Sequence, residues 1–268
     1  QLSFKEKIEV AKLMDKIRMS VIEMAPIVNE KIDSLLIKSV SSSVKNSVVA
    51  VPAGLSAESV AQAWEAVKGA KKPRLQVIAP MSPVQMEYGC HKKPAQLLEL
   101  IGEVVAECKK VCPDVEFVAD DATRSEKEFL FEVVKRAIAA GASTVTVCDS
   151  AGVMLPDEFS DFLSELAEAA PEVKTVSLGA CCSNSMSMAA ACAMAAIKAG
   201  AVEIKTSCGE ETLPTAVSVA QIIRLRGDFL GICADIAVTE LQRTMKQINW
   251  IIHTRRGKSP FDGGTGAL

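Results

Sequence analysis

Short apolar segments alternate with amphipathic helical patterns along the whole chain, and this alternation is the feature that most constrains its fold. Strands that alternate with helices are typical of a parallel sheet with helices packed around it. The first helix has a capping-box signal, because Ser3 is followed three residues later by Glu6. The pattern predicts strands over residues 20–24, 47–52, 74–80, 115–119, 144–148, 175–180 and 203–207.

The predicted helices separate these strands, and the chain begins on a helix that opens at Ser3. A parallel barrel closes with eight strands, so the seven strands found here leave two architectures. One is a TIM (β/α)8-type barrel whose first strand lies upstream of Gln1, and the other is an open, doubly wound sheet. No Gly-x-Gly-x-x-Gly turn follows any predicted strand, which disfavours a dinucleotide-binding sheet. We therefore predict an α/β TIM (β/α)8-type barrel with its first strand missing from this chain.

Composition narrows the class of protein further. A chain of 268 residues with 49% hydrophobic and 24% charged residues can bury a large core. A net charge of -3 and an aromatic content of 4% provide neither a basic field nor stacking platforms for nucleic acid. No apolar run approaches the roughly 20 residues of a membrane span. Nine scattered cysteines do not form a disulfide framework, and we expect a cytoplasmic protein with no nucleic-acid or membrane partner.

Polar side chains gather where the predicted strands end, which is the catalytic edge of a parallel barrel. They include Glu23, Asp120 with Asp121 and Arg124, Asp149 with Ser150, and the segment 181–184. An Arg–Asp network at this edge either positions an anionic ligand or simply ties loops together. Both interpretations are kept for Arg124.

Three ordered segments resemble one family. Residues 63–74 running into 81–88, residues 115–125 and residues 148–156 resemble the 2-isopropylmalate synthases, within the HMG-CoA lyase-like or DRE-TIM metallolyase family. The similarity runs from about residue 3 to residue 257. It implies one TIM-barrel domain over residues 1–256. Residues 257–268 then begin a linker to a C-terminal region that is absent here.

The resemblance implies a reaction in which a divalent metal, Mg, Mn or Zn, chelates a 2-oxo acid while enolised acetyl-CoA adds to its ketone carbon. In that family an aspartate and an arginine of the first strand, a His-x-His pair and an asparagine hold the metal and substrate. The two histidine positions fall on Cys181 and Ser183 of this chain, and the asparagine position falls on Val217. We therefore predict no metal site and no cofactor, and we assign no catalytic residue.

The resemblance also implies four substrate-binding positions. Asp120 stands for a glutamate, Ser150 for a threonine and Gln85 for a histidine, whereas Arg124 is unchanged. The leading interpretation is a 2-isopropylmalate synthase-like barrel that has lost the metal-dependent activity and keeps a pocket for a 2-oxo acid or another small anion.

Two other interpretations stay open. The chain is an active condensing enzyme or lyase of altered chemistry that uses Cys181, or a non-catalytic subunit that partners an intact homologue. The expected assembly is either a homodimer or a complex with an intact homologue. Cys181 and Cys182 are adjacent and point to opposite sides of a strand, so at most one of them faces the barrel mouth. Free cysteines are more often small buried hydrophobes than reactive groups.

Overall fold

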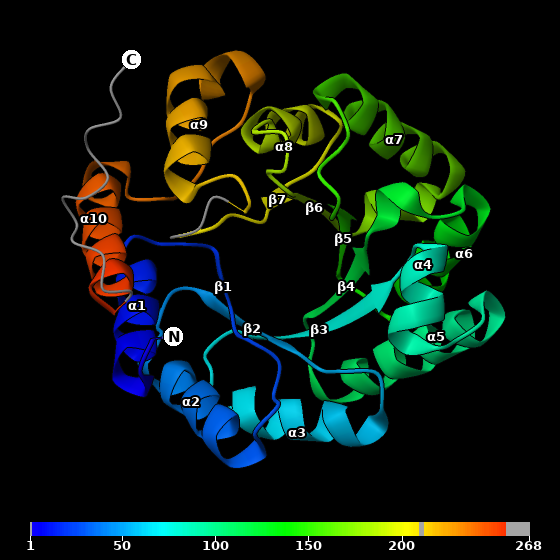
Figure 1. The fold of residues 1–268 in the computed structure, drawn as a ribbon, viewed down its shortest axis with the longest axis horizontal. Helices are drawn as coiled ribbons and strands as arrows, with labels where there is room; N and C mark the ends of the chain where they lie inside the picture. The colour runs from blue at the N-terminus through cyan, green and yellow to red at the C-terminus, as the bar shows by residue number, and fades with distance from the viewer. Residues whose placement is uncertain (1, 209–211, 256–268) are drawn as a thin grey trace.

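Seven parallel strands organise the chain in the computed structural model, which describes residues 2–208 and 212–255. Each strand pairs with the next one in sequence, in the order β1 to β7. The strands lie at the centre of a ring of helices (Figure 1). The alternation of strands and helices predicted from the sequence is thus confirmed. The strands are β1 (Val21–Glu23), β2 (Val48–Pro52), β3 (Pro73–Pro80), β4 (Val115–Asp120), β5 (Thr144–Asp149), β6 (Ser177–Cys182) and β7 (Glu203–Ile204).

Interior side chains from strands that are not neighbours touch one another, so the sheet is curled. Arg74 of β3 forms two hydrogen bonds with Glu203 of β7, at 2.7 and 3.0 Å. Within the described residues β1 and β7 do not pair. A cavity of about 680 Å³ lies between them and is lined by residues of both strands and of the helix over residues 216–230. The architecture is therefore α/β and TIM-barrel-like, as predicted, with the ring of strands open at this seam.

The helices pack outside the strands and largely match the predicted ranges. Ser3 and Glu6 form the predicted capping box, in which the Ser3 amide donates to Glu6 Oε2 at 2.6 Å. The last helix begins at Val238, and residues 83–90 form two short helical turns between β3 and the next long helix. The helices are α1 (Phe4–Lys16), α2 (Glu30–Ser43), α3 (Ala57–Val67), α4 (Pro83–Gln85), the π-helix η1 (Met86–Cys90), α5 (Pro94–Val111), the 3-10 helix η2 (Ala122–Arg124), α6 (Lys127–Ala140), α7 (Pro156–Ala169), the 3-10 helix η3 (Pro171–Thr175), α8 (Ala189–Lys198), α9 (Ala216–Leu230) and α10 (Val238–Arg255).

The main hydrophobic core lies between the outer face of the strands and the helices. Leu75, Val77 and Ala79 of β3 are fully buried there, together with Phe117 and Phe159. A smaller cluster joins α1, α9 and α10, and includes Ile17, Leu241 and Ile248. None of the described helices is long and apolar enough to cross a bilayer. The predicted linker at 257–268 lies outside the described residues.

The inner face of the strands is polar, in contrast to the outer face. The alternate residues Arg74 and Gln76 of β3 point inward, as do Glu116 of β4 and Thr146 of β5. Gly179 of β6 lies directly opposite, where a Cβ atom would stand 2.3 Å from Thr146 Oγ1. Glycine therefore permits the close approach of β5 and β6, and sets the spacing of the side chains that follow on these two strands.

Candidate functional site

An interior network of charged and amide groups crosses the barrel. It comprises Arg74, Gln76, Glu116 and Lys205 with their partners Glu23, Thr146 and Glu203. Gln76 Nε2 donates to Glu23 Oε1 and to Glu116 Oε2, both at 2.8 Å. Arg74 also donates to Asp114 Oδ2 at 2.9 Å. Every charge in this network therefore has an opposite charge or a hydrogen-bond donor beside it.

Lys205, which follows β7, is the cation that contacts Glu23 and Glu116 in this network. Its Nζ lies 2.9 Å from Glu116 Oε1 and also contacts Glu23 Oε1. Burial disfavours the charged ammonium, but Glu116 and Glu23 outweigh that cost and raise the pKa of Lys205. Burial likewise disfavours the Glu116 carboxylate, but Lys205, Thr146 and Gln76 lower its pKa. Both groups are therefore charged near neutral pH.

Further toward the carboxyl ends of the strands than this network, three of the four predicted substrate-binding residues meet next to β4 and β5. We call Asp120, Ser150 and Gln85 the rim cluster. Ser150 Oγ donates to Asp120 Oδ1 at 2.6 Å, and Gln85 Nε2 donates to Asp120 Oδ2 at 3.0 Å. The other amide atom, Gln85 Oε1, is buried and has no hydrogen-bond partner among the described residues. A buried acceptor of this kind favours a donor from a bound molecule.

Arg124, the fourth predicted residue, lies beside the rim cluster and binds Asp121 rather than Asp120. Its Nε and Nη2 donate to the two Asp121 oxygens at 2.8 and 2.7 Å. Asp121 is fully buried, has a left-handed backbone at φ 56°, and its amide donates to Ser150 Oγ at 3.0 Å. The guanidinium is thus held at the edge of the rim cluster, and its Nη1 is not used in these bonds.

Asp149 secures the loop after β5. Its carboxylate accepts hydrogen bonds from Thr123 Oγ1 at 2.9 Å and from the amides of Gly152 and Met154 at 3.1 and 3.2 Å. Asp149 therefore caps the loop before α7, which leaves the neighbouring Ser150 hydroxyl free to reach Asp120.

Two thiols face the barrel interior at the ends of β5 and β6. Cys148 and Cys181 are register partners on these adjacent strands, and each thiol shifts the pKa of the other. Cys182 faces the opposite side, where it is buried beneath α8 near Cys192. The prediction that at most one of the adjacent cysteines faces the barrel mouth is confirmed.

The three residues to which the resemblance assigned metal-ligand positions do not converge. Cys181 faces the interior, the Ser183 hydroxyl contacts Ser185 Oγ at 3.3 Å, and Val217 packs in the apolar cluster of α1, α9 and α10. Within the described ranges no group of three or more His, Cys, Asp or Glu side chains is arranged to hold a metal ion. Mg²⁺ and Mn²⁺ prefer oxygen ligands, and Zn²⁺ in proteins needs three or four Cys, His or carboxylate ligands, so one thiol with a hydroxyl and an aliphatic chain does not form a ligand set for any of these ions.

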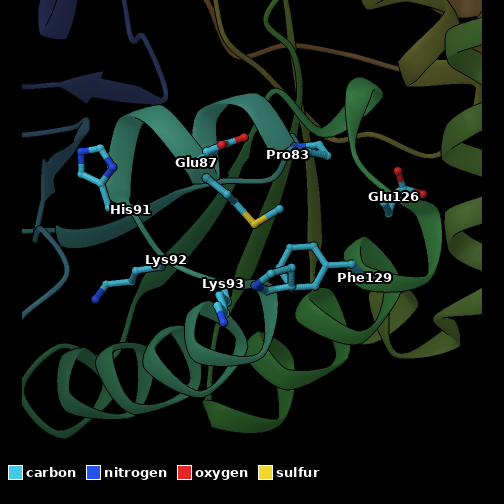
Figure 2. A pocket seen from close by; sticks show the side chains of 9 residues that line it. Pro83, Glu87, His91, Lys92, Lys93, Glu126 and Phe129 are labelled. Atoms are coloured by element: carbon cyan, nitrogen blue, oxygen red, sulfur yellow. The ribbon is translucent and has the colours of Figure 1, made fainter.

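A second hollow lies beside the helical segment that carries Gln85. This cavity of about 420 Å³ is formed by η1, the loop before α5 and the start of α6 (Figure 2). His91, Lys92 and Lys93 contribute to its wall with Glu87, Glu126 and Phe129. It is separate from the barrel interior, since neither Asp120 nor Ser150 lines it.

Sequence reasoning missed the interior network and the pairing of Cys148 with Cys181. The signal for the network was present, because Arg74 and Gln76 place polar side chains at alternate positions of an otherwise apolar strand. The sequence places Cys148 and Cys181 at or next to the ends of consecutive predicted strands. Their pairing depends on the register between β5 and β6, which local patterns do not specify.

Comparisons with known proteins identify the family. Residues 1–219 match the family model described as HMGL-like. The 2-isopropylmalate synthase of Lysinibacillus sphaericus is 31% identical over 252 residues, which cover 92% of this chain and 49% of that protein. The 2-isopropylmalate synthase of Pyrococcus abyssi is 31% identical over 253 residues, covering 92% of this chain and 52% of that protein. The chain thus spans about half the length of these curated relatives.

Solved structures with the same fold include two hydroxymethylglutaryl-CoA lyases. The Bacillus subtilis enzyme has a TM-score of 0.78 at 13% identity, over 97% of this chain and 90% of that one. The Pseudomonas aeruginosa enzyme has a TM-score of 0.76 at 15% identity, over 96% of this chain and 88% of that one. At these identities the likeness concerns the fold alone. The family model, which matches most of the chain, and the 2-isopropylmalate synthases at 31% identity show that this chain belongs to the HMGL-like (DRE-TIM) family.

Proposed function

We propose that this barrel binds a 2-oxo acid, or the corresponding 2-hydroxy acid, at the rim cluster and does not by itself carry out a metal-dependent condensation. The observation that carries the proposal is the buried Gln85 Oε1 without a partner among the described residues, next to the hydrogen-bonded Asp120 and Ser150. A hydroxyl group of a ligand, or a water molecule that it holds, supplies the missing donor.

The carboxylate of such a ligand needs a positive partner, because Asp120 is itself negative. Arg124 provides it: Nε and Nη2 bind Asp121, and Nη1 is directed to the ligand in the proposed complex. A charge-assisted hydrogen bond of this type contributes about 1.5–3 kcal/mol, which corresponds to roughly ten- to hundredfold in affinity. Ile78 of β3 is 40% exposed on the inner face and offers an apolar wall for the ligand's aliphatic part.

Isothermal titration calorimetry with pyruvate and with 2-oxoisovalerate, each with and without Mn²⁺ or Zn²⁺, tests the proposal. We expect binding that does not require the metal. Arg124→Met should weaken binding by roughly tenfold or more, because it removes the charge-assisted bond. Ser164→Ala, on the exposed face of α7, is the control and should bind as the wild type does.

Two results would contradict the proposal. One is the absence of heat for both acids in a protein whose circular dichroism shows it to be folded. The other is a metal-dependent condensation of acetyl-CoA with either acid, which would show that this chain carries out the reaction.

A further inference from the structure

We propose that Cys148 and Cys181 form a dithiol site that is reversibly converted to a disulfide by exchange with a low-molecular-weight disulfide. The site lies in the barrel interior at the ends of β5 and β6. It does not depend on the acid-binding proposal, since the thiol exchange uses no atom of Asp120, Gln85, Ser150 or Arg124.

Strand register carries this inference. Cys148 pairs directly with Cys181 in the parallel ladder of β5 and β6, and both side chains point inward. Neighbouring strands lie about 4.7–4.9 Å apart. Disulfides join Cα atoms that are about 4.4–6.8 Å apart, so this pair can be bridged without a change of register.

The two thiols differ in access and in acidity. Cys181 is partly exposed, whereas Cys148 is 3% exposed. The hydrogen bond from Cys148 and the nearby Lys205 ammonium lower the pKa of Cys181, while the same hydrogen bond and burial raise the pKa of Cys148. Glu23 and Asp120, the acidic groups that also face the pair, oppose the Cys181 thiolate. The accessible thiol is therefore the better attacking group, and the buried one is placed to resolve the intermediate.

The exchange is balanced in two steps. The Cys181 thiolate attacks one sulfur of the small disulfide, forming a mixed disulfide and releasing one thiolate. Cys148 then loses its proton to that thiolate or to solvent and attacks Cys181 Sγ. The Cys148–Cys181 bond forms, and the second small thiolate leaves. The protein loses two electrons and two protons, and the small disulfide becomes two thiols.

A second thiol pair supplies an internal contrast. Cys182 on the outer face of β6 and Cys192 of α8 are near each other, but they are 1% and 4% exposed between the strand and the helix. Burial raises the pKa of Cys182. Neither thiol is open to an incoming disulfide, so this pair should stay reduced when the interior pair reacts.

Peptide mapping tests the site. The reduced protein is treated with bis(2-hydroxyethyl) disulfide, its remaining thiols are alkylated, and it is digested with trypsin. Peptide 137–174 contains Cys148 as its only cysteine, and peptide 175–198 contains Cys181, Cys182 and Cys192. We expect these two peptides to become linked, and dithiothreitol to separate them.

Matched serine variants assign the link. Cys182→Ser should form it as the wild type does, whereas Cys181→Ser should not. Cys148→Ser should stop at a mixed disulfide on Cys181. The inference is overturned if the link persists in Cys181→Ser, or if a folded wild-type protein forms no link while its exposed Cys233 becomes modified. The second outcome is read in the wild type alone, and loss of the link in a folded Cys182→Ser protein would also overturn the inference, so a decisive result does not depend on the stability of Cys181→Ser or Cys148→Ser.

Discussion

The interior network and the rim cluster both consist of polar side chains inside one barrel, but they differ in how completely their hydrogen-bonding groups are matched. In the interior network the Glu116 carboxylate is 1% exposed and is met by Lys205, Gln76 and Thr146. In the rim cluster Gln85 Oε1 has no partner among the described residues, and Ser150 is exposed. A buried charge destabilises the fold unless it is paired and hydrogen bonded. A buried acceptor without a hydrogen-bond donor, next to exposed polar groups, instead favours binding of a ligand that supplies the donor. Variants of the two regions should therefore separate stability from affinity.

The largest effect on stability is expected from Arg74→Met. Arg74 pairs with Glu203 and Asp114 and lies 3.8 Å from Glu116, so its removal takes the nearest cation away from Glu203 and Asp114 and one of two cations away from the buried Glu116. Loss of one member of a buried pair costs about 3–5 kcal/mol. Urea unfolding followed by circular dichroism measures this loss. Lys127→Met breaks the solvent-exposed pair with Glu165 and should cost less than about 1 kcal/mol. Equal losses in the two variants would refute the structural role of the interior network.

A smaller effect, with a defined pH dependence, is expected from Glu116→Gln. The pKa of Glu116 is lowered in the folded state, so its contribution is fully present above its ordinary value of about 4.5 and is lost as the pH falls through the lowered value. Near neutral pH the substitution should reduce the free energy of unfolding by about 1–3 kcal/mol, because Lys205 loses one of its two carboxylates.

Unfolding curves recorded from pH 7 downwards measure the difference between the wild type and Glu116→Gln. The difference should shrink in the acidic range, where the wild-type carboxylate also becomes neutral. A difference that is constant across this range would mean that the charge of Glu116 contributes nothing, and that the loss arises from packing alone.

The smallest effect on stability is expected from Ser150→Ala. The substitution removes the hydroxyl that donates to Asp120 and accepts from the Asp121 amide, while Gln85 still binds Asp120. Loss of such bonds at an exposed position should cost no more than about 1.5 kcal/mol of stability. The affinity for 2-oxo acids, measured by calorimetry, should fall by a larger free energy than the stability does. A large loss of stability with unchanged affinity would reverse the roles that we assign to the two regions.

The site was predictable only in part, and the reason differs from residue to residue. Asp120, Ser150 and Gln85 were identified as substrate-binding positions through the family resemblance, and the structure brings them within hydrogen-bond distance. Arg124 was identified in the same way, but its bidentate bond to Asp121 depends on a left-handed residue that no local pattern indicated. Their roles in binding stay predictions until the calorimetric experiment is done.

The sequence by itself determined the seven strands, most of the helices and the polar edge where the strands end, because periodicity, caps and strand ends are local properties. Only the tertiary structure decided that Arg74 reaches Glu203 across the barrel and that Cys148 lies beside Cys181. These contacts join residues far apart in the chain. They depend on the curvature of the sheet and on strand register, and a shift of one residue would turn every side chain of a strand to its other face.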